Sequence, residues 1–199
     1  VKLTSVYISV DSTVYGFIEF VDSIKKDAIA AINELKQRGI RCVMLTGDRS
    51  EIAETFAESF GITEVHAEVL PSEKAGIISR YQDRGEIVAM VGDGINDAPA
   101  LTQADVGIAL GTGTDIAMES GDIVLVKGDL AGVVRTAILA EATFKKIKQN
   151  LFWAFIYNVI AIPLAFLGLL HPVIAEGAMA LSSINVVWNS NRLRKTHLF

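Results

Sequence analysis

The fold of this chain is decided by the stretch Val91-Gly92-Asp93-Gly94-Ile95-Asn96-Asp97-Ala98-Pro99-Ala100-Leu101. It follows the apolar run 87–91, which predicts a fully buried strand of a parallel sheet. Beyond that strand, Asp93, Asn96 and Asp97 gather at its carboxyl end, where open α/β sheets bind their ligands. Carboxylate and amide oxygens suit Mg²⁺, which commonly shares its coordination with substrate phosphates. A solvated turn is the alternative, because Gly, Asp and Asn are frequent turn residues.

Short apolar runs and helical patterns alternate on both sides of this stretch. Strands are predicted at 6–10, 14–20, 41–45, 64–67, 106–110 and 123–126, and helices at 24–38, 50–60, 71–84 and 99–103. Gly39 and Gly61 end two of the helices, and Pro71 begins a third. This alternation predicts an α/β fold with a Rossmann-like parallel sheet and right-handed crossovers.

Apolar residues are concentrated in the last part of the chain. Between residues 150 and 191 the only formal charge is Glu176. Residues 151–170 are long enough to cross about 30 Å of hydrocarbon, and 173–189 form a second, slightly short span after a break at His171-Pro172. Basic residues flank both outer ends, which predicts that the soluble domain and the carboxyl terminus are cytoplasmic. A buried pair of soluble helices is the alternative.

The predicted organisation is a soluble domain over 1–135, a stalk helix over 136–150, two transmembrane helices over 151–191 and a tail over 192–199. The net charge of −5 argues against a nucleic-acid partner, which needs a basic face. Cys42, the single cysteine, lies in an apolar run and is interpreted as a core residue rather than a ligand or half of a disulfide.

Two further groups point to the same chemistry as Asp93. Thr46 ends a predicted strand and offers a hydroxyl and an amide to an anion. Lys74, in the first turn of the helix that Pro71 begins, offers a compact positive charge to a phosphoryl oxygen. Taken singly, Thr46-Gly47-Asp48 is an ordinary turn and Lys74 a solvated surface lysine. Together the three predict a phosphoryl-transfer pocket, in which catalysis is mostly positioning and charge neutralisation.

These segments resemble the heavy-metal-transporting P-type ATPases of the copper(I) type. The matching segments are 46–48, 71–74, 91–101 and 111–115, and the similarity runs over nearly the whole chain. The resemblance implies the second half of a phosphorylation domain of the haloacid-dehalogenase type, followed by the last two membrane helices of the pump as a transmembrane hairpin. The Gly111–Thr114 loop is interpreted as structural.

The resemblance also implies a role for each polar residue. Asp93 would ligate Mg²⁺ with support from Asp97, and Asp48 would lie near the nucleotide, ATP, or the dephosphorylation machinery. The residues assigned to catalysis are Thr46, Gly47, Asp48, Lys74, Asn96 and Asp97, of which Thr46, Lys74 and Asn96 would hold the phosphoryl group.

One motif of the family is absent. Its Asp-Lys-Thr-Gly-Thr segment, whose first Asp becomes phosphorylated, does not occur in this chain. Asp11-Ser12-Thr13 keeps the spacing of Asp and Thr but continues with Val14 and Tyr15, and it predicts a hairpin turn. We therefore expect the sheet to lack its nucleophile strand and to be incomplete, and the chain alone to be inactive.

The membrane part carries a second resemblance, to the intramembrane signature of copper(I) pumps. Tyr157 and Asn158 lie on the first span, and Met179 and Ser183 lie four residues apart on the second, hence on one helix face. Copper(I) is a soft ion selected by sulfur, so these four residues are the implied ligands of transported copper(I) or silver(I). The alternative is that Met179 fills a packing gap and the serines permit close helix contact.

The leading hypothesis is therefore part of an ATP-driven copper(I) exporter. Its expected partners are the lipid bilayer, a metallochaperone and the remaining segments of the pump, namely the nucleophile segment, the nucleotide-binding and actuator domains and the other membrane helices. Three alternatives stay open: a membrane-anchored phosphatase of the dehalogenase type, a potassium-pump subunit, and a catalytically inactive pump fragment that acts as a partner.

Overall fold

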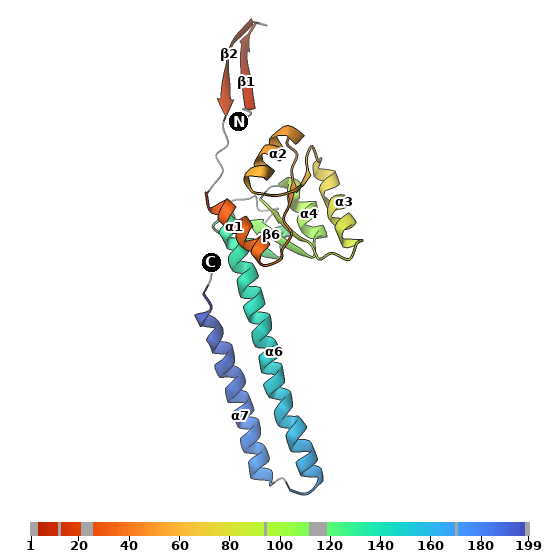
Figure 1. Ribbon diagram of the computed structural model, residues 1–199, viewed down its shortest axis with the longest axis vertical. Coiled ribbons are helices and arrows are strands. Elements are labelled where there is room, and N and C mark those ends of the chain that lie inside the picture. The colour runs from red at the N-terminus through yellow and green to blue at the C-terminus, as the bar shows by residue number, and fades with distance from the viewer. Residues whose placement is uncertain are drawn as a thin grey trace. The chain divides into compact units, whose positions relative to one another are not determined.

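The computed structural model describes residues 4–11, 13–20, 26–93, 95–111, 119–169 and 171–197. The chain divides into two compact units, Val1–Val134 and Arg135–Phe199, and each is described by itself. In the first unit, every strand and helix predicted up to residue 126 is found, with ends that shift by at most two residues. In chain order these are β1 (Thr4–Val10), β2 (Thr13–Phe20), α1 (Lys26–Gln37), β3 (Val43–Leu45), α2 (Ser50–Ser59), β4 (Glu64–His66), α3 (Pro71–Gln82), β5 (Ala89–Gly92), η1 (Ile95–Asp97), α4 (Ala98–Gln103), β6 (Val106–Leu110) and β7 (Ile123–Leu125) (Figure 1).

The glycines predicted to end α1 and α2 do so for the expected reason. Gly39 and Gly61 have φ angles of +77° and +61°, a left-handed conformation that glycine adopts without steric cost. The chain then folds back, and the amide of Ile62 donates to the carbonyl of Ala57 at 2.7 Å. Ala57 and Ile62 pack with Ile32 of α1 in one buried cluster. The helix ends thus place α1 and α2 against the same core.

The strands of the described residues form three separate sheets. β1 and β2 make an antiparallel hairpin, β3 pairs with β4 in parallel, and β5, β6 and β7 form a parallel sheet in that order. The parallel pairings confirm the predicted α/β class. Leu101, the last residue of the stretch that decides the fold, is fully buried and packs with Ala109 of β6.

The prediction of a fully buried central strand is wrong. Ile87 is 88% exposed, Ala89 is exposed, and Met90 and Val91 are only half-buried. β5 pairs with β6 on one side, but among the described residues no strand pairs with its other edge or with the free edge of β3. Between these edges lies a cavity of about 550 Å³, lined by residues that include Val43, Leu45, Ile77, Val88, Met90 and Val106. The apolar run 87–91 therefore lacks the neighbour that would bury it.

The second unit continues the helix that begins at Leu130. α6 (Leu130–Phe166) is one helix of 37 residues, and α7 (Pro172–Asn191) is followed by the short η2 (Arg192–Lys195). The first predicted span ends four residues early, because α6 stops at Phe166 and the chain turns through Gly168 at φ +71°. Among the described residues, α6 is the one helix long and apolar enough to cross a membrane.

α6 and α7 run antiparallel and side by side (Figure 1). Side-chain hydrogen bonds join them at three levels. Lys146 Nζ lies 2.9 Å from Asn189 Oδ1, Asn150 Nδ2 donates to Ser190 Oγ at 2.8 Å, and Asn185 Nδ2 donates to the Tyr157 hydroxyl at 3.0 Å. Polar groups in an apolar medium are stabilised by such pairing across helices.

Candidate functional site

Thr46 begins the site at the carboxyl end of β3. Its hydroxyl donates to Asp48 Oδ2 at 2.8 Å and accepts from the amide of Asp48 at 3.1 Å, which closes a tight turn around Gly47. The carbonyl of Thr46 accepts from the amide of Val69 at 3.1 Å. Because Val69 lies just before α3, this bond joins the turn after β3 to the beginning of that helix.

α3 begins as predicted at Pro71. The carboxylate of Glu73 accepts from the amide of Leu70 at 3.0 Å, which satisfies one of the free amides at the helix start. Lys74, one residue further, reaches out of the first turn. Its Nζ lies 2.6 Å from Asp97 Oδ1, and each side chain is only 12% exposed. The structure thus brings Lys74 and Asp97 together as a buried ion pair.

Gly92 explains how Asp97 comes so close to β5. A Cβ at residue 92 would lie 2.7 Å from Asp97 Cβ and 2.9 Å from Asp97 Oδ2, closer than real side chains approach. Only glycine therefore leaves room for η1 to fold back over the end of the strand. Gly92 of the deciding stretch is therefore required by its packing against Asp97.

Asp93 directly follows Gly92 at the end of β5, Asn96 directly precedes Asp97 in η1, and both side chains are exposed. Within the described part of the chain, no group of three His, Cys, Asp or Glu side chains could hold a metal ion by itself. Mg²⁺ does not need such a group, since it is commonly held by one or two carboxylates together with waters and substrate phosphates. The exposed Asp93 carboxylate at the end of β5 fits that donor set.

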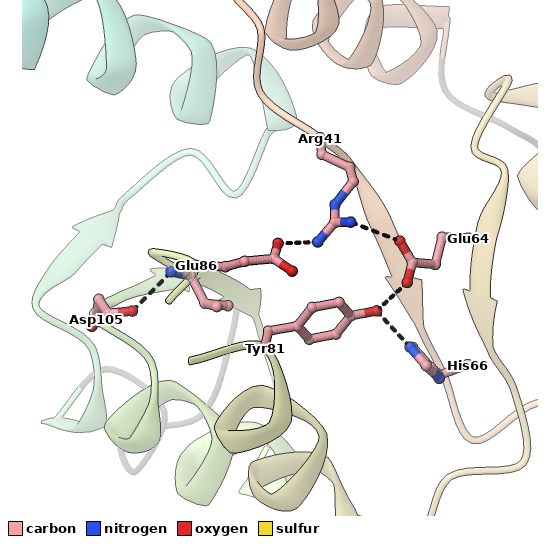
Figure 2. Close-up of polar contacts among 7 residues, drawn as sticks. Arg41, Glu64, His66, Tyr81, Glu86 and Asp105 are labelled. Carbon is pink, nitrogen blue, oxygen red and sulfur yellow. Dashed lines mark hydrogen bonds and ion pairs between the residues drawn. The ribbon is translucent and has the colours of Figure 1, made fainter. Parts of the chain in front are cut away.

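A second polar cluster joins β4, α3 and the segments before β3 and β5 (Figure 2). Arg41, two residues before β3, forms an ion pair with Glu86 and lies 3.6 Å from Glu64 Oε2. The Tyr81 hydroxyl donates to Glu64 Oε1 at 2.6 Å and lies 2.7 Å from His66 Nε2. Since that hydroxyl gives its proton to Glu64, His66 Nε2 must be the donor in the second bond. The cluster ties β3, β4 and α3 to the segment before β5.

Sequence reasoning missed this cluster because its members form no local motif and are spread over positions 41 to 86. Burial, and then the hydrogen bond to Glu64, raise the pKa of Tyr81 to about 12. The hydrogen bond to Glu86 raises the pKa of Arg41. Burial also raises the pKa of the Cys42 thiol, in keeping with its interpretation as a core residue.

The predicted ligands of the transported ion lie on α6 and α7. Tyr157 faces α7, where it meets Asn185, a residue that sequence reasoning did not assign. Met179 is 67% exposed, and Ser183 donates to its carbonyl at 3.1 Å, which is consistent with their position on one helix face. Asn158 is exposed and donates to Ala154 of its own helix at 2.9 Å. An uncharged amide inside an apolar run was the signal that could have identified Asn185.

A family model described as haloacid dehalogenase-like hydrolase matches residues 2–105, slightly more than half of the chain. The chain belongs to this family. Membership fits the geometry above, since Thr46, Lys74 and Asp93 lie at the carboxyl ends of parallel strands or at the beginning of the helix that follows one.

Curated relatives of this haloacid dehalogenase-like chain are named as metal pumps. It is 54% identical to a copper-exporting P-type ATPase of Staphylococcus epidermidis over 98% of its own length and 25% of that protein. It is 52% identical to a probable copper-importing P-type ATPase A of Enterococcus hirae over 97% of its length and 27% of that protein. The predicted resemblance to heavy-metal P-type ATPases is therefore confirmed, and the chain spans about a quarter of the length of these relatives.

A solved structure of a zinc-transporting PIB-type ATPase in the E2.Pi state is also similar. It matches with a TM-score of 0.85 and 37% identity, over 96% of this chain and 31% of that one. A catalytic CPx-ATPase domain, CopB-B, matches 61% of this chain and 47% of that domain with a TM-score of 0.50 and 32% identity. The likeness to the zinc pump thus extends beyond the dehalogenase-like region into the helices that follow it.

Proposed function

We propose that this chain is part of an ATP-driven pump for copper(I) or silver(I), working through a phospho-aspartate intermediate. In this proposal it supplies the phosphate- and magnesium-binding half of the phosphorylation site and two helices of the transport path. The observation that carries the proposal is the buried Lys74–Asp97 pair beside Asp93, in a chain whose relatives over 98% of its length include a copper-exporting P-type ATPase.

Each polar residue has a separate role at the proposed phosphorylation site. Asp93 is the ligand for Mg²⁺, because Asp97 is already neutralised by Lys74 at 2.6 Å. Asp97 then positions the Lys74 ammonium, which together with Thr46 and Asn96 holds the phosphoryl oxygens. When bound, Mg²⁺ would neutralise charge on the phosphate. Asp48 fixes the Thr46 hydroxyl at 2.8 Å, and Gly47 lets the turn close.

The nucleophile is proposed to come from a segment outside this chain. The unpaired edges of β3 and β5 and the apolar cavity of about 550 Å³ between them suit an inserted parallel strand. The carboxyl end of such a strand would emerge beside Thr46 and Asp93. Asp11 is a poor substitute, since it is exposed in the β1–β2 turn with a φ of 48°. This argues against the phosphatase alternative.

The membrane part is proposed to supply some of the ligands of the transported ion. Met179 brings the sulfur that a soft ion selects, and Tyr157, Asn158 and Ser183 are its oxygen and amide neighbours. A single sulfur is not enough to hold copper(I), so thiolates from another helix of the pump would complete the site. The exposure of Met179, Ser183 and Asn158 is consistent with that arrangement.

The proposed topology places α6 and α7 across the membrane as a hairpin. The soluble unit and the carboxyl terminus then face the cytoplasm, because cations flank the outer ends of both apolar stretches. Export is the proposal, following the name of the Staphylococcus epidermidis relative.

Phosphorylation by labelled ATP tests the site in a complete pump into which this chain has been built. Asp93→Ala is expected to abolish Mg²⁺-dependent formation of acid-stable phosphoenzyme. Asp83→Ala, which removes an exposed carboxylate at the far end of α3, is the matched control and should leave it unchanged. Near wild-type phosphorylation of Asp93→Ala would refute the assigned role. The chain alone should form no phosphoenzyme, and label on Asp11 would favour the phosphatase.

Metal-stimulated turnover tests the ion assignment. Met179→Ala should depress copper(I)- and silver(I)-stimulated ATP hydrolysis, whereas Leu181→Ala, an exposed apolar residue on the same helix, should not. Phosphorylation by inorganic phosphate serves as the control, because it probes the phosphate site without requiring bound metal. Zn²⁺ stimulation equal to that by copper(I) would overturn the copper assignment while leaving the pump assignment intact.

A further inference from the structure

The ends of the α6–α7 hairpin differ sharply in charge. Residues 141–195 contain six Lys and Arg side chains and two Glu, a net charge of +4. All six cations lie in two short segments, 145–148 and 192–195, just outside the apolar stretches. Of the two acids, Glu141 lies one turn before Lys145 on α6, and Glu176 lies near the opposite end of α7.

Hydrogen bonds bring these two segments together, although they are more than forty residues apart. Lys146 Nζ lies 2.9 Å from Asn189 Oδ1, Asn189 Nδ2 donates to Asn150 Oδ1 at 2.8 Å, and Asn150 Nδ2 donates to Ser190 Oγ at 2.8 Å. η2 (Arg192–Lys195) follows α7 directly. These bonds place the two basic segments at the same end of the hairpin, and we call Lys145, Lys146, Lys148, Arg192, Arg194 and Lys195 the basic cluster.

The contacts that the structure gives to this cluster are with neutral groups. The Lys146 ammonium lies near the side-chain oxygens of Gln149 and Asn189, and the Lys148 ammonium lies 4.4 Å from the centre of the Phe144 ring. None of the ion pairs found among the described residues involves a member of the cluster. Lys145, Lys148, Arg192, Arg194 and Lys195 are exposed. The positive charge of this end is thus available to an outside anion.

The tryptophans mark the depth of the cluster in the bilayer. Trp153 and Trp188, the two tryptophans of the chain, lie within five residues of Lys148 and Arg192 on the apolar side. Tryptophan concentrates at the membrane–water interface, where its ring lies at the level of the headgroups. The cluster then lies at the level of the lipid phosphates of one leaflet.

We infer that the basic cluster is a binding site for the headgroups of anionic phospholipids. This rests on the proposed membrane hairpin and adds a ligand that the phosphorylation and ion sites do not require. Juxtamembrane clusters of four to eight Lys and Arg attract anionic lipid, with about a fivefold gain in affinity for each cation near the surface, which corresponds to about 1 kcal/mol. Arg192 and Arg194 offer planar forks that bind a phosphate through two hydrogen bonds.

Tryptophan fluorescence in bilayers tests the inference on the full chain. The chain is reconstituted into phosphatidylcholine containing a minor fraction of either brominated phosphatidylglycerol or brominated phosphatidylcholine, and bromine quenches tryptophans that touch the labelled lipid. We expect the brominated phosphatidylglycerol to quench more strongly, with a relative affinity of about fivefold or more. High salt should reduce the difference, because the attraction is electrostatic.

Charge variants distinguish binding of anionic lipid at the basic cluster from a general electrostatic attraction of anionic lipid to the whole chain. Lys145→Gln with Arg192→Gln and Arg194→Gln removes three of the six cations and should strongly reduce the preference for phosphatidylglycerol. Arg80→Gln with Lys127→Gln, which neutralises exposed cations of the other unit, should leave the preference intact. Arg192→Lys with Arg194→Lys should retain most of it, since the charge remains. Quenching of the triple variant by brominated phosphatidylcholine shows that the helices still insert.

Each outcome decides a separate point. Equal quenching by the two lipids in the unaltered chain, or an undiminished preference in the triple variant, overturns the lipid site. Displacement of phosphatidylglycerol by soluble glycerol phosphate at equal concentration also overturns it in favour of a site for free phosphates. Quenching by neither lipid shows that the tryptophans are outside the bilayer, and it refutes the membrane hairpin together with this inference.

Discussion

The Lys74–Asp97 pair gives a measurable prediction about the stability of the site. Coulomb's law at an effective dielectric constant of about 20 gives an attraction of about 6 kcal/mol at their separation, and the loss of hydration of the two ions opposes it. Removing one partner leaves the other charge buried, which typically costs about 3–5 kcal/mol. Lys74→Met and Asp97→Asn should each destabilise the region by that amount.

The double variant isolates the interaction. With both charges removed, no buried ion is left unpaired, so Lys74→Met with Asp97→Asn should cost about 3 kcal/mol less than the sum of the two single changes. The surface pair Arg38–Glu34 on α1 is a control, because exposed pairs four residues apart on a helix contribute only about 0.3–0.5 kcal/mol.

Hydrogen exchange of the full chain in detergent, followed by mass spectrometry, supplies the measurement. Peptides that cover α3 and the η1–α4 segment report the free energy of local opening. Each single variant should exchange at least about a hundredfold faster there, the factor that corresponds to about 3 kcal/mol. Additive effects in the double variant would show that the two side chains do not interact, and would remove the argument that Asp97 positions Lys74.

Two further predictions follow from neighbouring contacts. Gly92→Ala should displace Asp97 and accelerate hydrogen exchange over η1–α4, as Asp97→Asn does. Gly76→Ala in α3 is the control: an added Cβ there has no neighbour within 4 Å, so this change should stabilise the helix by about 1 kcal/mol. Equal effects of the two changes would contradict the contact of Gly92 with Asp97. The pKa of Tyr81 is raised to about 12 from 10.0, so Tyr81 should stabilise the fold fully below pH 10 and lose this contribution as the pH rises to about 12. The difference in stability between the unaltered chain and Tyr81→Phe should therefore shrink only in that window. A constant difference from pH 9 to 12 would show that the pKa is not raised.

The positions of the site residues were predictable because they depend on local patterns. Strand ends follow from apolar runs and glycines, so Thr46 and Asp93 were assigned to the carboxyl ends of strands, and Pro71 marked the start of the helix that carries Lys74. The Lys74–Asp97 pair was beyond that reasoning. The two residues are 23 apart in sequence, and their contact depends on how α3 packs beside η1.

Burial was the property least predictable from the sequence. The run 87–91 has the composition of a strand covered on both faces, and in this chain it lies beside an unfilled cavity instead. The apolar composition of the run is the one expected for a strand inside a complete sheet. Its exposure in the structure depends instead on which neighbouring strands are present. The same limit applies to Asn185, because its partner Tyr157 lies 28 residues away on another helix.

The open edges of β3 and β5 have a consequence for handling the protein. Each presents a row of unpaired amides and carbonyls, and such edges template pairing with other chains. Two copies could exchange or stack strands at this gap, so the chain made without a filling segment should self-associate through it. The brevity of β3, three residues, and the charge of Arg41 at its beginning limit this tendency. A soluble, monodisperse preparation would call for a strand peptide or a larger part of the polypeptide to occupy the gap.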